Sequence, residues 1–131
     1  MIVLDTHVWV WYIDSPDVLS SSALHIIDKS LKKNSINISS ISSWEIYMLE
    51  KKGRLKFKIP VDLWIQKCER LSYFRFIPVD NDIAKLAVSL PGTFHSDPAD
   101  RIIIATANSL AATLLTKDPR ILNYPHVKTI W

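Results

Sequence analysis

Cysteine and glycine are scarce in this chain of 131 residues, and it has neither a long apolar run nor a large charge of one sign. The single cysteine, Cys68, excludes an intramolecular disulfide and a thiolate zinc cluster. No apolar run approaches the roughly 18 residues that a membrane span needs, and the first residues lack the charged-then-apolar plan of a signal peptide. We therefore expect a cytoplasmic protein.

The composition is that of a folded chain. Hydrophobic residues make up 48% and charged residues 22% of it, which is ordinary for a globular protein and excludes a disordered one. The length suits one domain, so we predict a single domain over residues 1–131. The formal net charge of +3 permits a polyanionic partner but does not require one.

Apolar segments of strand length alternate with segments of helical periodicity. The patterns predict strands at 2–5, 36–39, 74–79, 113–116 and 127–130, and helices over 19–33, 43–52, 64–71, 83–90 and 99–110. A serine-rich bend is expected before the helix that begins at Ser43, and Gly53 is expected to end that helix. Strands that alternate with helices favour an α/β fold with a mostly parallel sheet covered on both faces.

Carboxylates gather where such a sheet would have its functional crevice, beyond the carboxyl ends of the strands. Three follow strands and three lie in first turns of helices: Asp5, Asp80 and Asp118, then Glu45, Asp97 and Asp100. All but Asp5 have an ordinary explanation as helix caps, capping-box members or turn residues. Asp5 ends an apolar strand and no polar turn follows it, so this carboxylate needs a partner.

Convergence of these acids would require a cation. If Glu45, Asp100 and Asp118 meet at Asp5, their mutual repulsion is intolerable without one. Ligands that offer only oxygen select hard ions such as Mg²⁺ or Mn²⁺. The four histidines follow no metal-binding spacing; we expect His7 beside the acidic residues and His95 as a hydrogen-bonding residue that fixes the loop before Asp97.

Four blocks of sequence, in this order and spacing, resemble the PIN-domain ribonucleases, most closely the VapC-like toxins of toxin–antitoxin pairs. They are Ile2 to His7 with Trp11 following, Ile41 to Ile46, His95 to Ala107, and Leu114 to Asp118. The similarity covers nearly the whole chain. It departs at Ala99, where relatives carry an aromatic residue.

The resemblance implies a three-layer α/β fold with about five strands in the order 3-2-1-4-5 and an acidic site that cleaves RNA with Mg²⁺ or Mn²⁺. Asp5 and Asp100 would bind the metal directly, while Glu45 and Asp118 would bind it or hold its waters. Asp97 lies one helical turn before Asp100 and would support it. The resemblance also implies a homodimer and a cognate antitoxin protein that blocks the site.

Several residues have two interpretations. Thr6 and Thr116 either orient the carboxylates by hydrogen bonds or are ordinary buried threonines. Arg101 either contacts a phosphate or pairs with a nearby acid. A basic run either follows an RNA backbone or is a solvated helix end; it comprises Lys51, Lys52, Arg54, Lys56 and Lys58, interleaved with Leu55 and Phe57.

Other functions also fit an aspartate after the first strand. A haloacid-dehalogenase-type phosphatase would use Asp5 as nucleophile, but the second aspartate that it needs is replaced by His7. A phospho-receiver module would need paired acids near the first strand, which are absent, and has only Asp80 as its phosphorylation site. A third alternative is a PIN-fold interaction module without catalytic activity.

Overall fold

A five-stranded sheet forms the centre of the computed structural model, which describes residues 1–131. The strands lie in the order β3-β2-β1-β4-β5, and every neighbouring pair is parallel. Their bounds are Ile2–Leu4 (β1), Ile36–Ser39 (β2), Phe74–Ile77 (β3), Thr113–Leu115 (β4) and Thr129–Ile130 (β5). The predicted α/β class, strand order and parallel sheet are confirmed.

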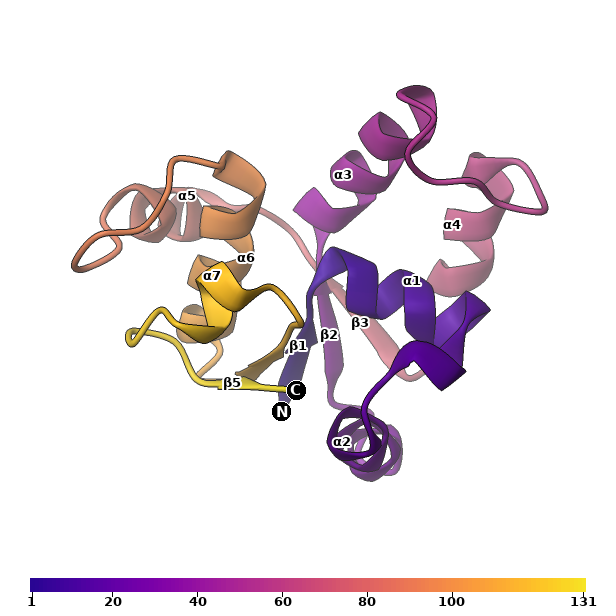
Figure 1. Ribbon diagram of the computed structural model, residues 1–131, viewed down its shortest axis with the longest axis horizontal. Helices are drawn as coiled ribbons and strands as arrows, with labels where there is room; N and C mark the ends of the chain where they lie inside the picture. The colour runs from indigo at the N-terminus through magenta and orange to yellow at the C-terminus, as the bar shows by residue number, and fades with distance from the viewer.

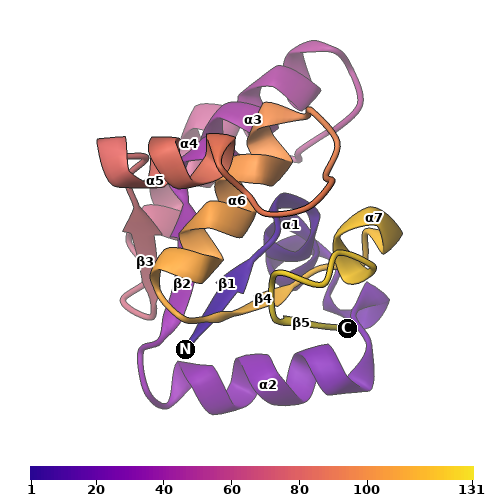
Figure 2. The ribbon, with the colours of Figure 1, turned by 90° about the vertical axis from the view of Figure 1, so that its left-hand side faces the viewer.

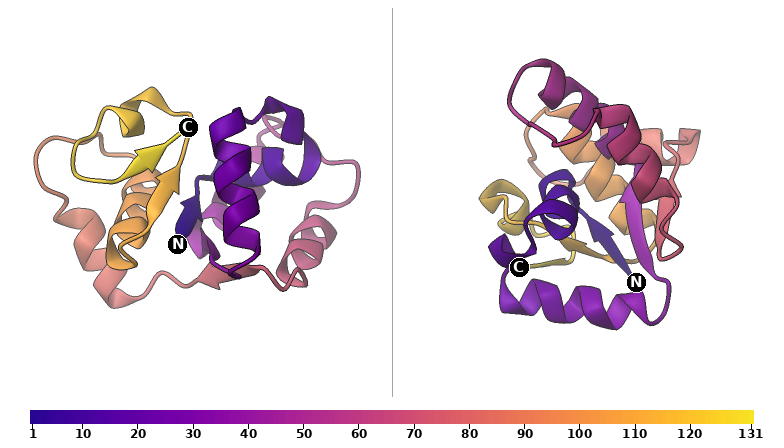
Figure 3. Two further views of the ribbon diagram at one scale, coloured as in Figure 1. Left: turned by 90° about the horizontal axis from the view of Figure 1, so that it is seen from below. Right: turned by 90° about the vertical axis from the view of Figure 1, so that its right-hand side faces the viewer.

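Seven α-helices surround this sheet. They are α1 (Thr6–Asp14), α2 (Ser21–Leu31), α3 (Ser40–Lys51), α4 (Val61–Glu69), α5 (Asn81–Val88), α6 (Pro98–Ser109) and α7 (Pro119–Leu122), with a 3-10 turn at Pro16–Val18. Helices α5 and α6 cover one face of the sheet, and α1, α2 and α4 cover the other (Figures 1 and 3). None of these helices is long and apolar enough to cross a membrane.

The first strand shows why the fold has three layers. Its side chains alternate between the two faces, as in any β-strand. Ile2 and Leu4 pack in the cluster that contains residues of α1, α2 and α4, whereas Val3 packs against Ile103 and Ile104 of α6. A central parallel strand is covered on both faces and therefore needs a continuous apolar run. The three residues of β1 form such a run, and all three are buried.

Helices α1, α3 and α7 differ from the sequence-based expectation, and α7 lies where only a turn was expected. Residues 6–14 form helix α1, which the run of β-branched and aromatic residues did not predict, because burial of Val8, Trp9 and Val10 outweighs their weak helix propensity. The serine-rich bend before Ser43 is absent: α3 begins at Ser40, with the Ser39 hydroxyl accepting from the Ile41 N–H. Gly53 ends α3 as predicted, with φ of 72°.

The strand order places a switch point at β1. The chain adds β2 and then β3 on one side of β1, and β4 and then β5 on its other side. Figure 2 shows α2 beside the end of the sheet where the strands begin, with the starts of α1, α3 and α6 at the opposite end. Ligands of open α/β sheets bind at that carboxyl end, next to the switch point.

Candidate active site

A pocket of about 460 Å³ opens at the carboxyl ends of β1 and β4. It contains all four predicted site acids, and only two of its ten lining residues, Val8 and Trp11, are hydrophobic. Its lining residues are Asp5, His7, Val8, Trp11, Glu45, Asp97, Asp100, Lys117, Asp118 and Arg120. The structure therefore brings together residues that are up to 113 positions apart in the sequence, while Asp80 lies outside the pocket and caps α5 by accepting from the Ile83 N–H at 2.9 Å.

Asp5 is held rigidly at the base of this pocket. It is only 8% exposed and caps the N-terminus of α1, where its Oδ1 accepts from the Thr6 N–H at 2.8 Å. The buried Thr116 hydroxyl donates to its Oδ2 at 2.6 Å. Burial raises the pKa of Asp5, although the hydrogen bonds from Thr116 and Thr6 lower it in part. The carboxylate is thus fixed in orientation but lacks a full charge partner.

Thr116 also connects Asp5 to Asp118. Its hydroxyl oxygen accepts from the Asp118 N–H at 3.1 Å, so one side chain at the end of β4 holds both acids. This contact follows from the pairing of β1 with β4, which places Leu4 opposite Leu115 and the two strand exits side by side. These contacts agree with the interpretation that Thr116 orients the carboxylates by hydrogen bonds.

Glu45 enters the pocket from α3 and does not form the expected capping box. Ser42 lies within α3, not at its cap, and is buried against Thr6, with 2.9 Å between the hydroxyl oxygens. The Thr6 hydroxyl also donates to Glu45 Oε1, so the glutamate is directed to the start of α1 instead of its own backbone. Burial raises the pKa of Glu45, and the charge of Asp5 adds to that rise.

Asp100 comes from the first turn of α6, where Asp97 is the N-cap. Asp97 Oδ1 accepts from the N–H groups of Ala99 (2.9 Å) and Asp100 (3.3 Å), which fixes this turn. Asp100 is 7% exposed, and burial together with the charge of Asp5 raises its pKa to about 7. A carboxyl group with such a pKa is poorly compensated in the protein alone.

His95 supports the same turn. Its Nδ1 accepts from the Asp97 N–H at 3.3 Å, which confirms that it fixes this loop. The imidazole proton must then be on Nε2 when the ring is neutral. Nε2 lies 3.2 Å from Asp100 Oδ2 but forms no hydrogen bond in this geometry, so a buried N–H faces the acidic pocket without a partner. No pattern in the sequence indicates this contact with Asp100.

Arg120 supplies the main positive charge among the acids. Its Nη2 lies 2.9 Å from Asp118 Oδ2 and 3.5 Å from Asp100 Oδ2, and its Nε donates to Asp118 Oδ1 at 3.2 Å. Burial alone would raise the pKa of Asp118, but the hydrogen bonds from Arg120 lower it below its usual value. This arginine cannot be identified as a site residue from the sequence, because nothing in Asp118-Pro119 indicates that a one-turn helix returns its side chain to the pocket.

The donor atoms fit a hard divalent cation. The four acids offer only carboxylate oxygens, which Mg²⁺ and Mn²⁺ prefer, and the buried carboxyls with raised pKa values lack the cation that would stabilise their charged forms. No three acidic or histidine side chains surround one point closely enough to hold an ion in their present positions. Arg120 bridges Asp118 and Asp100, so coordination by both would require this guanidinium to withdraw.

The contacts of Arg101 differ from both interpretations offered for it, a phosphate contact and an ion pair with a nearby acid. Its guanidinium donates to the backbone carbonyls of Ala87, Val88, Phe94 and His95, at 2.8 to 3.2 Å. These four bonds tie the end of α5 to the loop before α6, and no acid pairs with Arg101. With its donors engaged in this way, Arg101 is a structural residue and not the predicted RNA contact.

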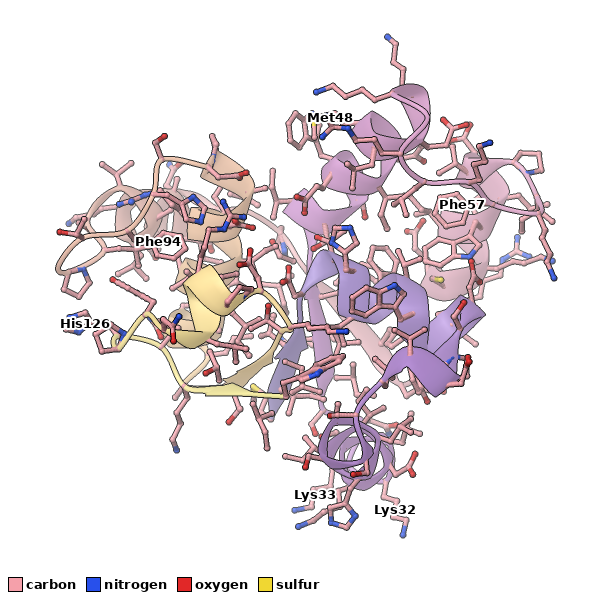
Figure 4. The ribbon with its side chains drawn as sticks, viewed as in Figure 1. Lys32, Lys33, Met48, Phe57, Phe94 and His126 are labelled. Atoms are coloured by element: carbon pink, nitrogen blue, oxygen red, sulfur yellow. The ribbon has the colours of Figure 1, made fainter.

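The predicted basic run lies outside the pocket, at the end of α3 and in the following loop. All five of its cations are exposed, and none forms an ion pair. Leu55 and Phe57 turn inward, and the Phe57 ring packs 4.8 Å from that of Trp64 (Figure 4). The apolar residues of the run therefore belong to the core and do not form a surface for stacking bases.

The tryptophans divide between the core and the surface. Trp9 and Trp64 are buried with a ring-centroid separation of 5.2 Å, so both are core residues. Trp44 is 55% exposed on α3. Trp11 is half-buried and faces the pocket, where the exposed His7 ring lies 5.8 Å from it, so His7 is beside the acids as expected. Cys68 is also buried in the core.

Comparison with known proteins identifies the family. A model described as the PIN domain matches residues 2–127. The chain belongs to the PIN domain family. The ribonuclease VapC22 of Mycobacterium tuberculosis is 33% identical to it over 132 residues, which are 99% of this chain and 98% of that relative. This family membership agrees with the four sequence blocks and with the pocket to which they contribute.

Solved structures of PIN proteins have the same fold. VapBC2 of Rickettsia felis, bound to a DNA fragment from its promoter, matches with a TM-score of 0.72 and 23% identity over 100% of this chain and 99% of that chain. FitAcB of Neisseria gonorrhoeae matches with a TM-score of 0.71 and 19% identity over 100% and 97%. At these identities the similarity supports the architecture of the chain.

Proposed function

We propose that this PIN domain is a metal-dependent endoribonuclease that cleaves RNA phosphodiester bonds as the toxin of a toxin–antitoxin pair. The observation that carries the proposal is the convergence of Asp5, Glu45, Asp100 and Asp118 on one pocket. The relative that shares 33% of its sequence over nearly all of the chain is named a ribonuclease, which agrees with this chemistry.

The residues have distinct roles in this proposal. Asp5 and Asp100, the two most buried acids, would hold a Mg²⁺ or Mn²⁺ ion directly, and Glu45 and Asp118 would bind it or hold its waters. Such an ion supplies an activated water and neutralises charge on the phosphoryl oxygens. Thr116 and Thr6 keep the carboxylates oriented through the hydrogen bonds described above, and Asp97 fixes the turn that carries Asp100.

The decisive experiment is cleavage of labelled RNA by the purified protein. We expect cleavage with Mg²⁺ or Mn²⁺ and none with EDTA. Absence of cleavage with either ion, in protein free of any bound partner, would contradict the ribonuclease proposal and favour the inactive PIN-fold module. A phosphatase would instead release phosphate from monoesters, and a receiver module would accept a phosphoryl group without cutting RNA.

Partners follow from the same proposal. A cognate antitoxin would cover the pocket, and two copies of the chain would form a homodimer in the cytoplasm. Aromatic residues near the pocket could contact such partners: Trp11 and Tyr12 are half-buried and Trp44 is exposed, whereas Val8 and Trp9 are buried in the core. Copurification with the product of a short neighbouring reading frame, and the mass in solution, would test these two partners.

Replacing Thr116 with valine should reduce cleavage about 10- to 100-fold while the fold persists. The substitution keeps the shape of a fully buried side chain but removes its hydrogen bonds to Asp5 and Asp118. Thr106→Val is the matched control, because Thr106 is equally buried and bonds only to the Ile102 carbonyl within α6. Initial cleavage rates of the two variants provide the measurement. Equal rates for Thr116→Val and Thr106→Val would show that the Thr116 side chain only fills space.

Charge reversal in the basic run should weaken RNA binding. Glu45 lies on α3 and Lys52 is its C-cap, so they are about 10 Å apart along the helix axis at 1.5 Å per residue. An RNA strand bound in the pocket can therefore reach these cations. Substituting Lys51, Lys52 and Arg54 with glutamate should flatten the dependence of log Kd on log salt by about 2, at ~0.7 per phosphate contact.

The control for this prediction reverses three exposed cations at the far end of the molecule. Lys29, Lys32 and Lys33 lie on or just after α2, remote from the pocket (Figure 4). Their reversal changes the net charge equally but should leave the slope near that of the unmodified protein. If both triple variants give the same slope, the basic run acts only through net charge and does not form a path for RNA.

A further inference from the structure

One wall of the acidic pocket contains the ammonium group of Lys117 and the indole ring of Trp11, with the ring of Trp131 beside them. Lys117 directly precedes Asp118, and its Nζ lies 5.8 Å from the ring centroids of both Trp11 and Trp131. Five carboxylates line the same pocket, but Lys117 pairs with none of them: every ion pair in the structure joins Asp100 or Asp118 to His95 or Arg120. Lys117 is therefore the one cation of the pocket whose charge is not already compensated by an acid.

Trp11 differs from the tryptophans that stabilise the core. Trp9 and Trp64 are buried within the large apolar cluster, whereas Trp11 is half-buried and lines the pocket. One part of its indole packs against that cluster, and the ring also meets side chains at the rim: the ring of Trp131 at 6.0 Å, the ring of His7 at 5.8 Å, and the ammonium group of Lys117. A large ring that remains partly open beside charged groups is suited to stacking a nucleobase.

We propose that Trp11 and Lys117 form a nucleotide-binding subsite beside the carboxylates, where the indole stacks on an unpaired base and the ammonium group binds an adjacent phosphate. This inference rests on the proposed ribonuclease function. A polyanion that approaches five carboxylates needs positive charge, and Arg120 is already engaged by Asp118 and Asp100. The flexible stem of Lys117 allows its ammonium group to leave the ring for a phosphate, which exposes the indole to the base.

The subsite selects a class of substrate. A base can lie against Trp11 only if it is not stacked in a helix, so the RNA must be single-stranded where it crosses this wall. Stacking on an indole tolerates any base, because every base offers a π-face. We therefore expect preference for unpaired RNA over duplex RNA, with little base discrimination from Trp11 itself.

RNA binding can be measured without cleavage in an Asp5→Asn background that contains Mg²⁺. The probe is a fluorescein-labelled single-stranded oligoribonucleotide of mixed sequence, followed by anisotropy over a range of KCl concentrations. Adding Lys117→Met, which keeps the length of the side chain, should reduce the slope of log Kd against log salt by about 0.7. Adding Trp11→Leu should weaken binding about tenfold at every salt concentration and leave the slope unchanged.

Matched controls separate this subsite from general charge and aromatic effects. Lys85→Met removes an exposed cation of α5, and Trp44→Leu removes an exposed indole of α3; neither residue lines the pocket, and both variants should bind like the parent. A duplex of the same sequence should bind more weakly to the parent and lose little with Trp11→Leu. Thermal melts establish that each variant is folded.

The outcomes are distinguishable from those of the functional proposal. Unchanged slopes for Lys117→Met, or losses equal to those of the controls, would overturn the subsite even if the unmodified protein cleaves RNA. If Trp11→Leu does not fold, the Lys117→Met slope decides alone, because that change leaves the rings in place. Failure of the unmodified protein to cleave RNA with Mg²⁺ or Mn²⁺ would instead contradict the ribonuclease function on which the subsite rests.

Discussion

Replacing Asp5 with asparagine is expected to reduce metal-dependent RNA cleavage by more than about a hundredfold. Loss of a group that merely supports a metal ligand costs 10- to 100-fold, so loss of a ligand should cost more. Asparagine can still accept from the Thr6 N–H through its Oδ1, and its Nδ2 amide group can donate to the Thr116 hydroxyl oxygen in place of the bond that Asp5 Oδ2 accepts, so the start of α1 and its contact with β4 should persist. Initial rates of cleavage of a labelled RNA, with circular dichroism to verify the fold, provide the measurement.

Asp80→Asn is the control for that experiment. Asp80 also follows a strand and caps a helix, but it lies at the edge strand β3 and outside the pocket. Asparagine is as good an N-cap as aspartate, so neither stability nor cleavage should change appreciably. Metal-dependent cleavage at the normal rate by Asp5→Asn would remove Asp5 from the site and with it the proposed mechanism.

Replacing Asp100 with asparagine is expected to abolish cleavage and yet stabilise the metal-free protein. Because burial and neighbouring acids raise the folded-state pKa of Asp100 from 3.8 to about 7, its protonated form favours folding. This contribution is complete below pH 3.8 and is lost as the pH rises through about 7, where ionised Asp100 destabilises the fold. At ~1.4 kcal/mol per pKa unit, the destabilisation of the fold by ionised Asp100 is at most about 4 kcal/mol, and with solvent screening we expect about 2 kcal/mol.

The melting temperature in EDTA tests this expectation. The melting temperature of the unmodified protein should decrease as the pH rises from 5 to 8. Asp100→Asn should melt several degrees higher than the unmodified protein at pH 8, and its melting temperature should depend less on pH. The groups that face Asp100 are Asp5, Glu45, Asp97, Asp118, His95 and Arg120.

Two comparisons complete this test. Asp80→Asn removes an acid that is not in the cluster, so it should not raise the melting temperature at pH 8. Adding Mn²⁺ should raise the melting temperature of the unmodified protein more than that of Asp100→Asn, since an ion that binds only the folded state stabilises it. If Asp100→Asn melts lower than the unmodified protein at pH 8, the carboxylate is well compensated by its neighbours, and the electrostatic account of the pocket is wrong.

The sequence predicted the sheet well because β1 is a wholly apolar run, as a buried central strand requires, and because the other strands are short segments that carry apolar residues at consecutive or alternate positions. It did not predict α1, since His7 to Tyr12 is rich in residues that favour strands and the helix depends on tertiary burial. It misplaced the start of α3 because serines are typical of caps and bends, whereas Ser42 is buried against Thr6. Only the folded structure could show this contact.

The acids of the site were predictable to different degrees. Asp5 and Asp118 follow neighbouring strands, so a parallel α/β sheet already places them at one edge. Glu45 and Asp100 resemble ordinary helix-terminal residues, and only similarity to the PIN family indicated their participation. Arg120 and Lys117 were missed because their positions depend on α7 and on the rings beside the pocket, neither of which leaves a pattern in the local sequence.

The most direct test of the account is a crystal structure of the protein soaked in Mn²⁺, with the ion located by its anomalous scattering. We predict an ion in the pocket coordinated by oxygens of Asp5 and Asp100 at about 2.1 Å, with Arg120 withdrawn from Asp100. An empty pocket at saturating Mn²⁺, with Arg120 still bridging Asp100 and Asp118, would contradict the proposal that these acids form a metal site.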